Sequence, residues 1–182
     1  MTEGRILICG TGRAGTSFLV RLLTRLGYDT GYTPEKDGYY PDQRAGCELE
    51  TNLWDTQAAW DRLPRIVKSP YLSEFLQVVP VPIEHVLIPV RDLAEVAQSR
   101  INAGVFWGTD EHPTAEKMAE KLGLAVATCM TRSIPFTLMQ FPRLVEDARY
   151  CLHALRGPLV DLRYGKKLDA FDKVHAEVRA AK

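Results

Sequence analysis

Short runs of consecutive apolar residues alternate along the chain with longer stretches in which apolar residues recur every three or four positions. The runs are typical of buried strands, and the recurring spacing is typical of amphipathic helices. This pattern predicts strands at 5–9, 65–68, 83–90 and 135–141, and helices at 16–26, 53–63, 72–79, 92–103, 113–130 and 145–155. Strands that alternate with helices favour a parallel sheet covered by helices. We therefore predict an α/β fold with a mainly parallel central sheet flanked by helices.

Residues that begin and end helices support several of these boundaries. Gly27 follows the first predicted helix, at a position where glycine commonly ends one. Asp92 is the first residue of the helix predicted at 92–103 and can cap it. The stretch 29–46 is rich in Gly, Tyr, Pro and Asp and shows no period. We expect it to be a long loop over a functional face.

The chain of 182 residues contains no repeat, low-complexity tract or linker that would divide it. A chain of this length buries roughly 70% of the surface that its unfolded form exposes, so it can form a core without disulfides or metals. We predict a single domain over 1–182. After Gly157 the sequence is charged and only partly helical, and we expect 158–182 to be a peripheral, frayed tail.

The 23 Lys and Arg residues are balanced by 23 Asp and Glu residues, so the formal net charge is zero. Binding to nucleic acid or to an anionic membrane depends on an excess of basic residues, and we expect neither partner. The longest apolar stretches, 6–9 and 86–90, are far shorter than the ~20 residues that cross a bilayer. The first residues do not resemble a signal peptide. These features predict a cytoplasmic protein.

The four cysteines include no C-x-x-C pair, and the four histidines do not add the close ligand pairs of a zinc site. We therefore expect reduced, mostly buried thiols and no metal ion.

A glycine-rich segment follows the first predicted strand directly, with the sequence Gly-Thr-Gly-Arg-Ala-Gly-Thr-Ser over 10–17. Such a loop lets backbone N–H groups converge on one anion, beside the positive end of the next helix. Its spacing matches the P-loop G-x-x-x-x-G-K-[ST], with Ser17 in the hydroxyl position but Thr16 in place of the lysine. An NTPase uses that lysine to hold phosphates, so a kinase is disfavoured and Arg13 is the substitute cation. The alternative is a turn whose glycines only permit tight packing.

The same segment resembles the phosphosulfate loop [KR]-[SA]-G-T-[ST] of sulfotransferases that use 3′-phosphoadenosine 5′-phosphosulfate. The match is position by position, and together with Gly12 the expected nucleotide-binding residues of the loop are Arg13, Ala14, Gly15, Thr16 and Ser17. The resemblance covers roughly residues 5–100, and more weakly the strand at 135–141 with 143–147. It implies a P-loop-type three-layer fold.

A second signature of that family is an Arg-Asp pair at the end of a strand, followed about two helical turns later by a serine. Arg91, Asp92 and Ser99 reproduce it, and the resemblance implies that Arg91 and Ser99 bind the 3′-phosphate of the nucleotide. An arginine leaving a strand and a hydroxyl on the next helix can both face the crevice at the carboxyl end of a parallel sheet. The alternative for Arg91 is a surface ion pair with Asp92 or Glu95.

Sulfuryl transfer needs cations at the leaving phosphate and a base for the proton of the acceptor. The resemblance implies that Arg13, with the loop N–H groups, binds the leaving phosphate, and that Thr16 and Ser17 bind oxygens of the phosphosulfate. Lys68 begins a Lys-Ser-Pro segment similar to the family's K-[DST]-P and is the candidate second cation.

The cytosolic branch of the family carries a K-T-H segment whose histidine is the base, but the corresponding residue here is Pro70. The chain is more similar to the bacterial, carbohydrate and protein-tyrosine branch, in which a glutamate beyond the first helix is the base. Glu50 is our first candidate and Glu48 the second. For each of them a solvated surface position is an equal alternative.

The resemblance implies a sulfotransferase that transfers a sulfuryl group to a hydroxyl or amine of a small-molecule or saccharide acceptor, without a metal, and releases adenosine 3′,5′-bisphosphate. Two alternatives stay open, a small P-loop ATP-dependent kinase and a non-catalytic nucleotide-binding module. The chain is short for the family and lacks an R-K-G-x-x-G-like segment near its end. Either its acceptor side is reduced, or a second subunit completes the site in a homodimer.

Overall fold

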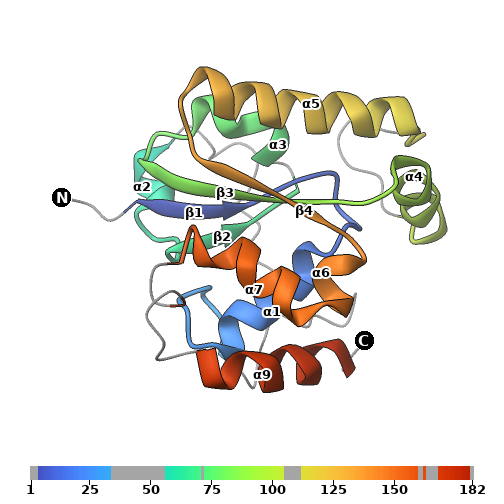
Figure 1. Ribbon diagram of the computed structural model, residues 1–182. Coiled ribbons are helices and arrows are strands. Elements are labelled where there is room, and N and C mark those ends of the chain that lie inside the picture. The colour runs from blue at the N-terminus through green and yellow to red at the C-terminus, as the bar shows by residue number, and fades with distance from the viewer. Residues whose placement is uncertain are drawn as a thin grey trace.

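The computed structural model describes residues 4–33, 56–70, 72–104, 112–159, 162 and 168–180. Four strands form one parallel sheet in the order β2-β1-β3-β4. Their bounds are β1 Arg5–Ile8, β2 Ile66–Lys68, β3 Ile83–Val90 and β4 Phe136–Gln140. Helices cover both faces of the sheet (Figure 1). The predicted α/β fold is confirmed, and the arrangement is consistent with a three-layer, P-loop-type fold.

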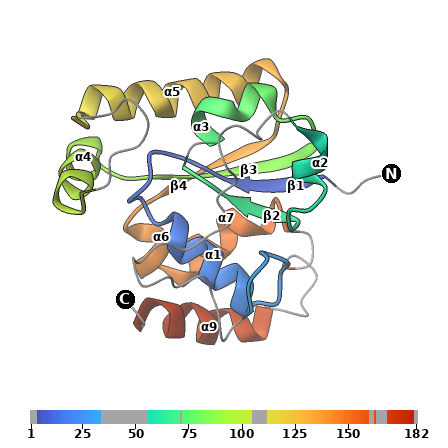
Figure 2. The ribbon, with the colours of Figure 1, turned by 180° about the vertical axis from the view of Figure 1, so that it is seen from behind.

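The helices form one layer on each side of the sheet, with α9 packed outside the lower layer (Figures 1 and 2). The upper layer contains α3 (Leu72–Phe75), which continues into a 3₁₀ turn at Leu76–Val78, and α5 (Ala115–Thr131). The lower layer contains α1 (Thr16–Arg25), α6 (Arg143–Glu146) and α7 (Ala148–Arg156), and α9 (Leu168–Ala180) contacts all three. The short α2 is Gln57–Trp60, and α4 (Leu93–Asn102) lies beyond the end of β3 and contacts α5. Every helix in the described ranges is too short or too polar to span a bilayer.

Strand β1 supplies side chains to two separate hydrophobic cores because successive residues of a strand point to opposite faces of the sheet. Ile6 and Ile8 belong to the core shared with α1, α7 and α9. Leu7 belongs to the core shared with α3 and α5. All three side chains are 0% exposed. Burial on both faces explains why this strand is a continuous apolar run in the sequence.

The predicted helix ends at Gly27 and Asp92 are confirmed. Gly27 has φ 77°, its N–H bonds to the Thr24 carbonyl at 2.9 Å, and the Tyr28 N–H bonds to the Leu23 carbonyl at 3.0 Å. This pair of bonds is the Schellman arrangement that ends a helix at glycine. The Asp92 carboxylate accepts the Glu95 N–H at 2.9 Å and so caps α4.

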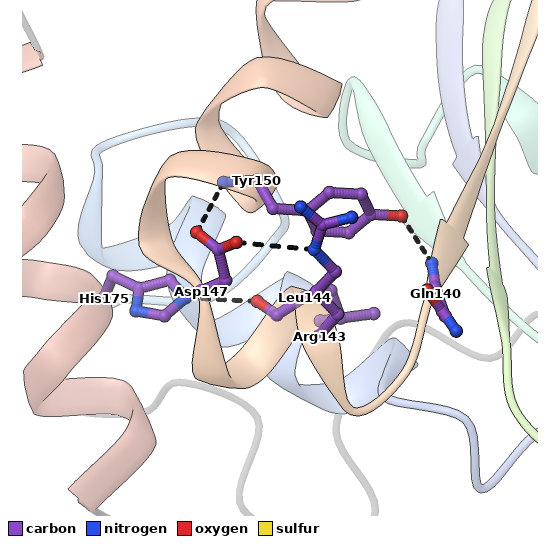
Figure 3. A network of polar contacts seen from close by, with 6 residues as sticks. All are labelled: Gln140, Arg143, Leu144, Asp147, Tyr150 and His175. Atoms are coloured by element: carbon purple, nitrogen blue, oxygen red, sulfur yellow. Dashed lines mark hydrogen bonds and ion pairs between the residues drawn. The ribbon is translucent and has the colours of Figure 1, made fainter.

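The single helix predicted at 145–155 is instead two helices, because Asp147 leaves the helical conformation and begins α7. Its carboxylate accepts the Tyr150 N–H at 2.9 Å, a bond that lowers the pKa of Asp147, as does its contact with Arg143. Figure 3 shows this network, in which the Gln140 N–H also donates to the Tyr150 hydroxyl at 2.7 Å. The Asp147 cap therefore sets the angle between α6 and α7 beside the edge strand β4.

The structure differs from the expectation of a peripheral tail at 158–182. Along α9, Phe171 and Val178 are 0% and 1% exposed, and His175 is 2% exposed. The His175 ring lies edge-on to Phe18 of α1, with ring centroids 5.2 Å apart, and its Nε2 is 3.1 Å from the Leu144 carbonyl oxygen (Figure 3). The described charged side chains of α9, at 172, 173, 177 and 179, are exposed, and the buried residues between them form too narrow a stripe to stand out in a charged sequence.

His85 gives the fold a predicted dependence on pH. Its Nε2 lies 2.8 Å from the Thr137 hydroxyl on β4, and partial burial lowers its pKa below the ordinary 6.5, against a smaller opposing effect of Glu84. As pH falls, the unfolded chain therefore binds the proton first, and the free energy of unfolding decreases from about pH 7 downward. We expect urea titrations between about pH 7.5 and about pH 5.5 to show a smaller decrease in His85→Gln than in the wild type. The exposed His153→Gln is the control, and an equal decrease in both variants would contradict the assignment.

Candidate functional site

The strand order creates a crevice at the carboxyl ends of β1 and β3. Strands β1 and β3 are neighbours in the sheet. The chain leaving β1 leads to β2 on one side of this pair, and the chain leaving β3 leads to β4 on the other side. Connections that leave two adjacent parallel strands in opposite directions open a crevice where such folds bind ligands. The glycine-rich loop follows β1 and Arg91 follows β3, so the two predicted phosphate motifs lie at this edge of the sheet.

The loop requires backbone conformations that favour glycine. Gly15 has φ 98° and is the N-cap residue of α1. A Cβ atom at this position would lie 3.0 Å from Cδ2 of Phe141, so the loop packs closely on the segment after β4. Arg13 has φ 52°, uncommon for a residue with a side chain, and that side chain is exposed. Strained residues of this kind cluster at ligand-binding sites, which is why Arg13 is a candidate ligand residue.

The N-cap residue of α1 makes no side-chain hydrogen bond to the first turn of the helix. Side chains of Asp92, Thr114 and Asp147 cap α4, α5 and α7, whereas the N-cap residue of α1 is Gly15, which has none to offer. The first intrahelical bond runs from the Leu19 N–H to the Gly15 carbonyl at 3.1 Å. The preceding N–H groups, including those of Thr16 and Ser17, have no acceptor within the helix. This helix end can bind an anion.

Ser73, which the sequence analysis did not single out, holds the start of the loop. Its hydroxyl oxygen accepts the Gly10 N–H at 3.0 Å and donates to the Gly10 carbonyl at 2.9 Å. The segment that follows β2 is bonded to the end of β1 as well, because the Ser69 N–H donates to the Ile8 carbonyl at 3.1 Å. These bonds fix where the loop leaves β1. A contact across 63 residues leaves no periodic signal in the sequence.

A pocket of about 540 Å³ lies between the loop and α4. It is lined by Arg13, Arg91, Glu95, Gln98, Ser99, Asn102 and Ala103. Nε of Arg13 donates to the Ser99 hydroxyl at 3.2 Å, although the two residues are 86 positions apart. The structure therefore brings Arg13, Arg91 and Ser99 together. Gln98 and Asn102 were not predicted, and Glu95 was named only as a possible ion-pair partner of Arg91. Their spacing with Ser99 places all four on one polar face of a helix.

Arg91 has the surface ion pair that the sequence left open as an alternative, and its partner is Glu95. Nε and Nη2 of Arg91 each lie 2.9 Å from Oε2 of Glu95. The guanidinium carbon also lies 5.0 Å from the centroid of the Phe141 ring. Arg91 therefore lines the pocket while Glu95 and the Phe141 ring both hold its guanidinium group.

Lys68 lies at the carboxyl end of β2, beside Ile8 in the strand register, and is 6% exposed. It is not among the residues that line the pocket. The candidate bases Glu50 and Glu48 lie outside the described residues, as does most of the loop predicted at 29–46. Their roles stay predictions.

Three cysteines, Cys9, Cys129 and Cys151, are buried thiols, as expected, and Cys47 lies outside the described residues. Burial raises the pKa of Cys9 to about 12, with a further increase from Cys129 and a smaller opposing effect of the Ser73 hydrogen bond. A thiol with such a pKa stays protonated and unreactive at neutral pH. In the described part of the chain, no three His, Cys, Asp or Glu side chains are grouped so as to hold a metal ion.

Replacing Gly15 by alanine tests the loop geometry. We expect the free energy of unfolding to fall by about 1–2 kcal/mol from the left-handed backbone alone, with a further loss from the contact with Phe141. The matched control is Gly123→Ala on an exposed turn of α5, where a Cβ meets nothing within 4 Å. That change should stabilise the chain by about 0.4–1 kcal/mol. Urea unfolding of both variants measures the difference, and stabilisation by Gly15→Ala would contradict the described loop.

No model of a known protein family and no curated protein matches the chain. The interpretation of the site therefore depends on the two motifs and on the geometry of the pocket that they form.

Proposed function

We propose that the chain is a sulfotransferase that uses 3′-phosphoadenosine 5′-phosphosulfate. The observation that carries the proposal is the contact between Nε of Arg13 and the Ser99 hydroxyl at 3.2 Å. Each residue belongs to a different motif that resembles the sulfotransferase family. Their meeting at one pocket, beside Arg91, supports a ligand that carries two separate anionic groups.

In this proposal the glycine-rich loop with the start of α1 binds one end of the nucleotide, and the residues around α4 bind the other. The N–H groups of the loop and of the first turn of α1 bind the 5′-phosphosulfate, with the hydroxyls of Thr16 and Ser17. Arg91 and Ser99 bind the 3′-phosphate. An arginine suits this position because its planar fork donates two parallel hydrogen bonds to a phosphate.

The transfer breaks the bond between sulfur and the bridging phosphate oxygen and forms a bond from sulfur to the acceptor oxygen or nitrogen. Arg13 and the loop N–H groups stabilise the charge that develops on the leaving phosphate, with Lys68 as a second cation. The acceptor proton passes to a carboxylate, for which Glu50 and then Glu48 are the candidates. By analogy with phosphoryl transfer, the rate enhancement comes mainly from positioning and from this charge stabilisation.

The products are a sulfated small molecule or saccharide and adenosine 3′,5′-bisphosphate. The acceptor site is assigned to no described residue. Two arrangements of the acceptor site stay open in the proposal. Either the site is reduced, or a second copy of the chain completes it in a homodimer.

The direct test is transfer of labelled sulfate from the donor to a panel of phenols, amines and saccharides, with EDTA present. We expect a labelled product with at least one acceptor class and loss of most of the rate in Arg13→Ala. Arg143→Ala is the control, because Arg143 is exposed and lies outside the pocket lining. Binding of adenosine 3′,5′-bisphosphate without transfer to any acceptor would favour a non-catalytic module. Magnesium-dependent phosphorylation by ATP would favour a kinase.

A further inference from the structure

The pocket that contains the two arginines also contains a carboxylate. Among the described residues that line it, Glu95 is the only acidic one. Its Oε2 accepts from both Nε and Nη2 of Arg91, each at 2.9 Å. A phosphate that binds Arg91 through the same two nitrogens must therefore replace Glu95.

The Arg91–Glu95 pair is weak enough to be replaced. The Glu95 side chain is 61% exposed and that of Arg91 26% exposed. Exposed ion pairs change an equilibrium constant by only a few-fold. Glu95 can leave by a change of rotamer, because its backbone N–H is held by the Asp92 cap at 2.9 Å and its main chain stays in place.

Arg91 keeps its position when the carboxylate leaves. Its guanidinium carbon lies 5.0 Å from the centroid of the Phe141 ring, on a segment that follows β4 and is independent of α4. A cation over an aromatic face is attracted to it whether or not a carboxylate is present. Arg91 can thus exchange one anion for another without losing its orientation.

We propose that the Glu95 carboxylate competes with a bound phosphate for the Arg91 guanidinium group. This competition weakens phosphate binding and speeds release of the nucleotide product. The inference deepens the proposed function and rests on it for the identity of the nucleotide. The competition at Arg91 requires only that some phosphate group binds to this residue. When the phosphate leaves, the carboxylate occupies both nitrogens again, so rebinding of the product has to displace it. Without this competition, the bisphosphate would bind tightly and leave slowly, and its release would limit turnover.

The test compares Glu95→Gln with the wild type in calorimetric titrations with inorganic phosphate and with adenosine 3′,5′-bisphosphate. Glutamine keeps the shape but not the charge, and we expect both dissociation constants to fall about two- to fivefold. The dissociation rate of the bisphosphate, measured by stopped-flow displacement, should fall as well. The gain should shrink as salt is added, because salt screens exposed charges. Glu116→Gln is the control, since Glu116 is also a first-turn acid of a capped helix but lies outside the pocket lining.

A double-mutant cycle separates competition from general repulsion. In an Arg91→Ala background, Glu95→Gln should have no effect on phosphate affinity, because the competition acts only through Arg91. An equal gain in that background would mean simple charge repulsion and would overturn the proposal. Weaker binding in Glu95→Gln would mean that the carboxylate orients Arg91, which also overturns it.

The failure of this inference and of the proposed function can be told apart. If inorganic phosphate binds more tightly to Glu95→Gln but the bisphosphate binds to neither protein, the competition stands and the proposed nucleotide is wrong. If the bisphosphate binds and Glu95→Gln leaves its affinity and release unchanged, the proposed nucleotide stands and the competition is wrong. If neither ligand binds, both proposals fail. Thermal unfolding of the variants checks that each one is folded.

Discussion

Replacing Arg91 by alanine is expected to weaken binding of adenosine 3′,5′-bisphosphate by roughly 10- to 150-fold. This range corresponds to the loss of one charge-assisted hydrogen bond, which contributes about 1.5–3 kcal/mol to the binding free energy. Arg91 lines the pocket and presents Nε and Nη2 together to one acceptor, as both contact Oε2 of Glu95 at 2.9 Å. Calorimetric titration of wild type and variant in EDTA measures the effect. Arg91→Lys should bind with intermediate affinity, because lysine keeps the charge but not the planar fork.

Arg143→Ala is a closely matched control for this prediction. Nε of Arg143 lies 3.4 Å from Oδ2 of Asp147, four residues later, and its guanidinium carbon lies 4.4 Å from the centroid of the Tyr150 ring (Figure 3). Arg91 has the same kinds of partner, a carboxylate four residues on and an aromatic ring, but only Arg91 lines the pocket. The bisphosphate affinity of Arg143→Ala should equal that of the wild type. Equal losses in the two variants would show that the effect does not come from the pocket.

Replacing Phe171 by alanine is expected to lower the free energy of unfolding by about 3–5 kcal/mol, the usual cost of removing a buried phenyl group. Phe171 is 0% exposed, and its ring stacks on His175 with centroids 5.9 Å apart. His175 in turn lies 3.1 Å from the Leu144 carbonyl oxygen, so the substitution loosens α9 from α6 as well as from α1. Urea unfolding followed by circular dichroism measures the change.

The control for this substitution lies on the same helix. Lys173 is 81% exposed on α9 and has a single exposed contact with Glu177 at 4.0 Å. Lys173→Ala should change the free energy of unfolding by less than about 0.5 kcal/mol. A loss below about 1 kcal/mol in Phe171→Ala would mean that α9 is not part of the core, as the sequence alone suggested.

Strands β1 and β3 could be predicted from the sequence because each contains a continuous apolar run that is buried, residues 6–8 in β1 and 86–88 in β3. The strand predicted at 83–90 has the observed bounds Ile83–Val90. Arg13, Arg91 and Ser99 were found through local motifs, and the parallel sheet places the ends of β1 and β3 side by side. Motif and topology together therefore predicted three of the residues that meet at the pocket, although not which of them contact each other.

What could not be predicted depends on contacts between distant segments or on competing local signals. The bond between Ser73 and Gly10 joins a side chain to a backbone 63 residues away. The apolar spacing over 145–155 continues through Asp147, so it concealed the cap that separates α6 from α7. Whether Arg91 pairs with Asp92 or with Glu95 depends on which carboxylate caps α4. The Asp92 carboxylate caps the helix, and Glu95 pairs with Arg91.

Calorimetric titration of the wild-type protein with adenosine 3′,5′-bisphosphate in EDTA and, separately, with Mg-ATP decides whether this pocket binds the sulfuryl donor. We expect metal-independent binding of the bisphosphate and much weaker binding of Mg-ATP, because the loop carries Thr16 where an NTPase has its lysine. Preference for Mg-ATP, or binding of neither nucleotide, would contradict the assignment of this pocket to a sulfuryl donor.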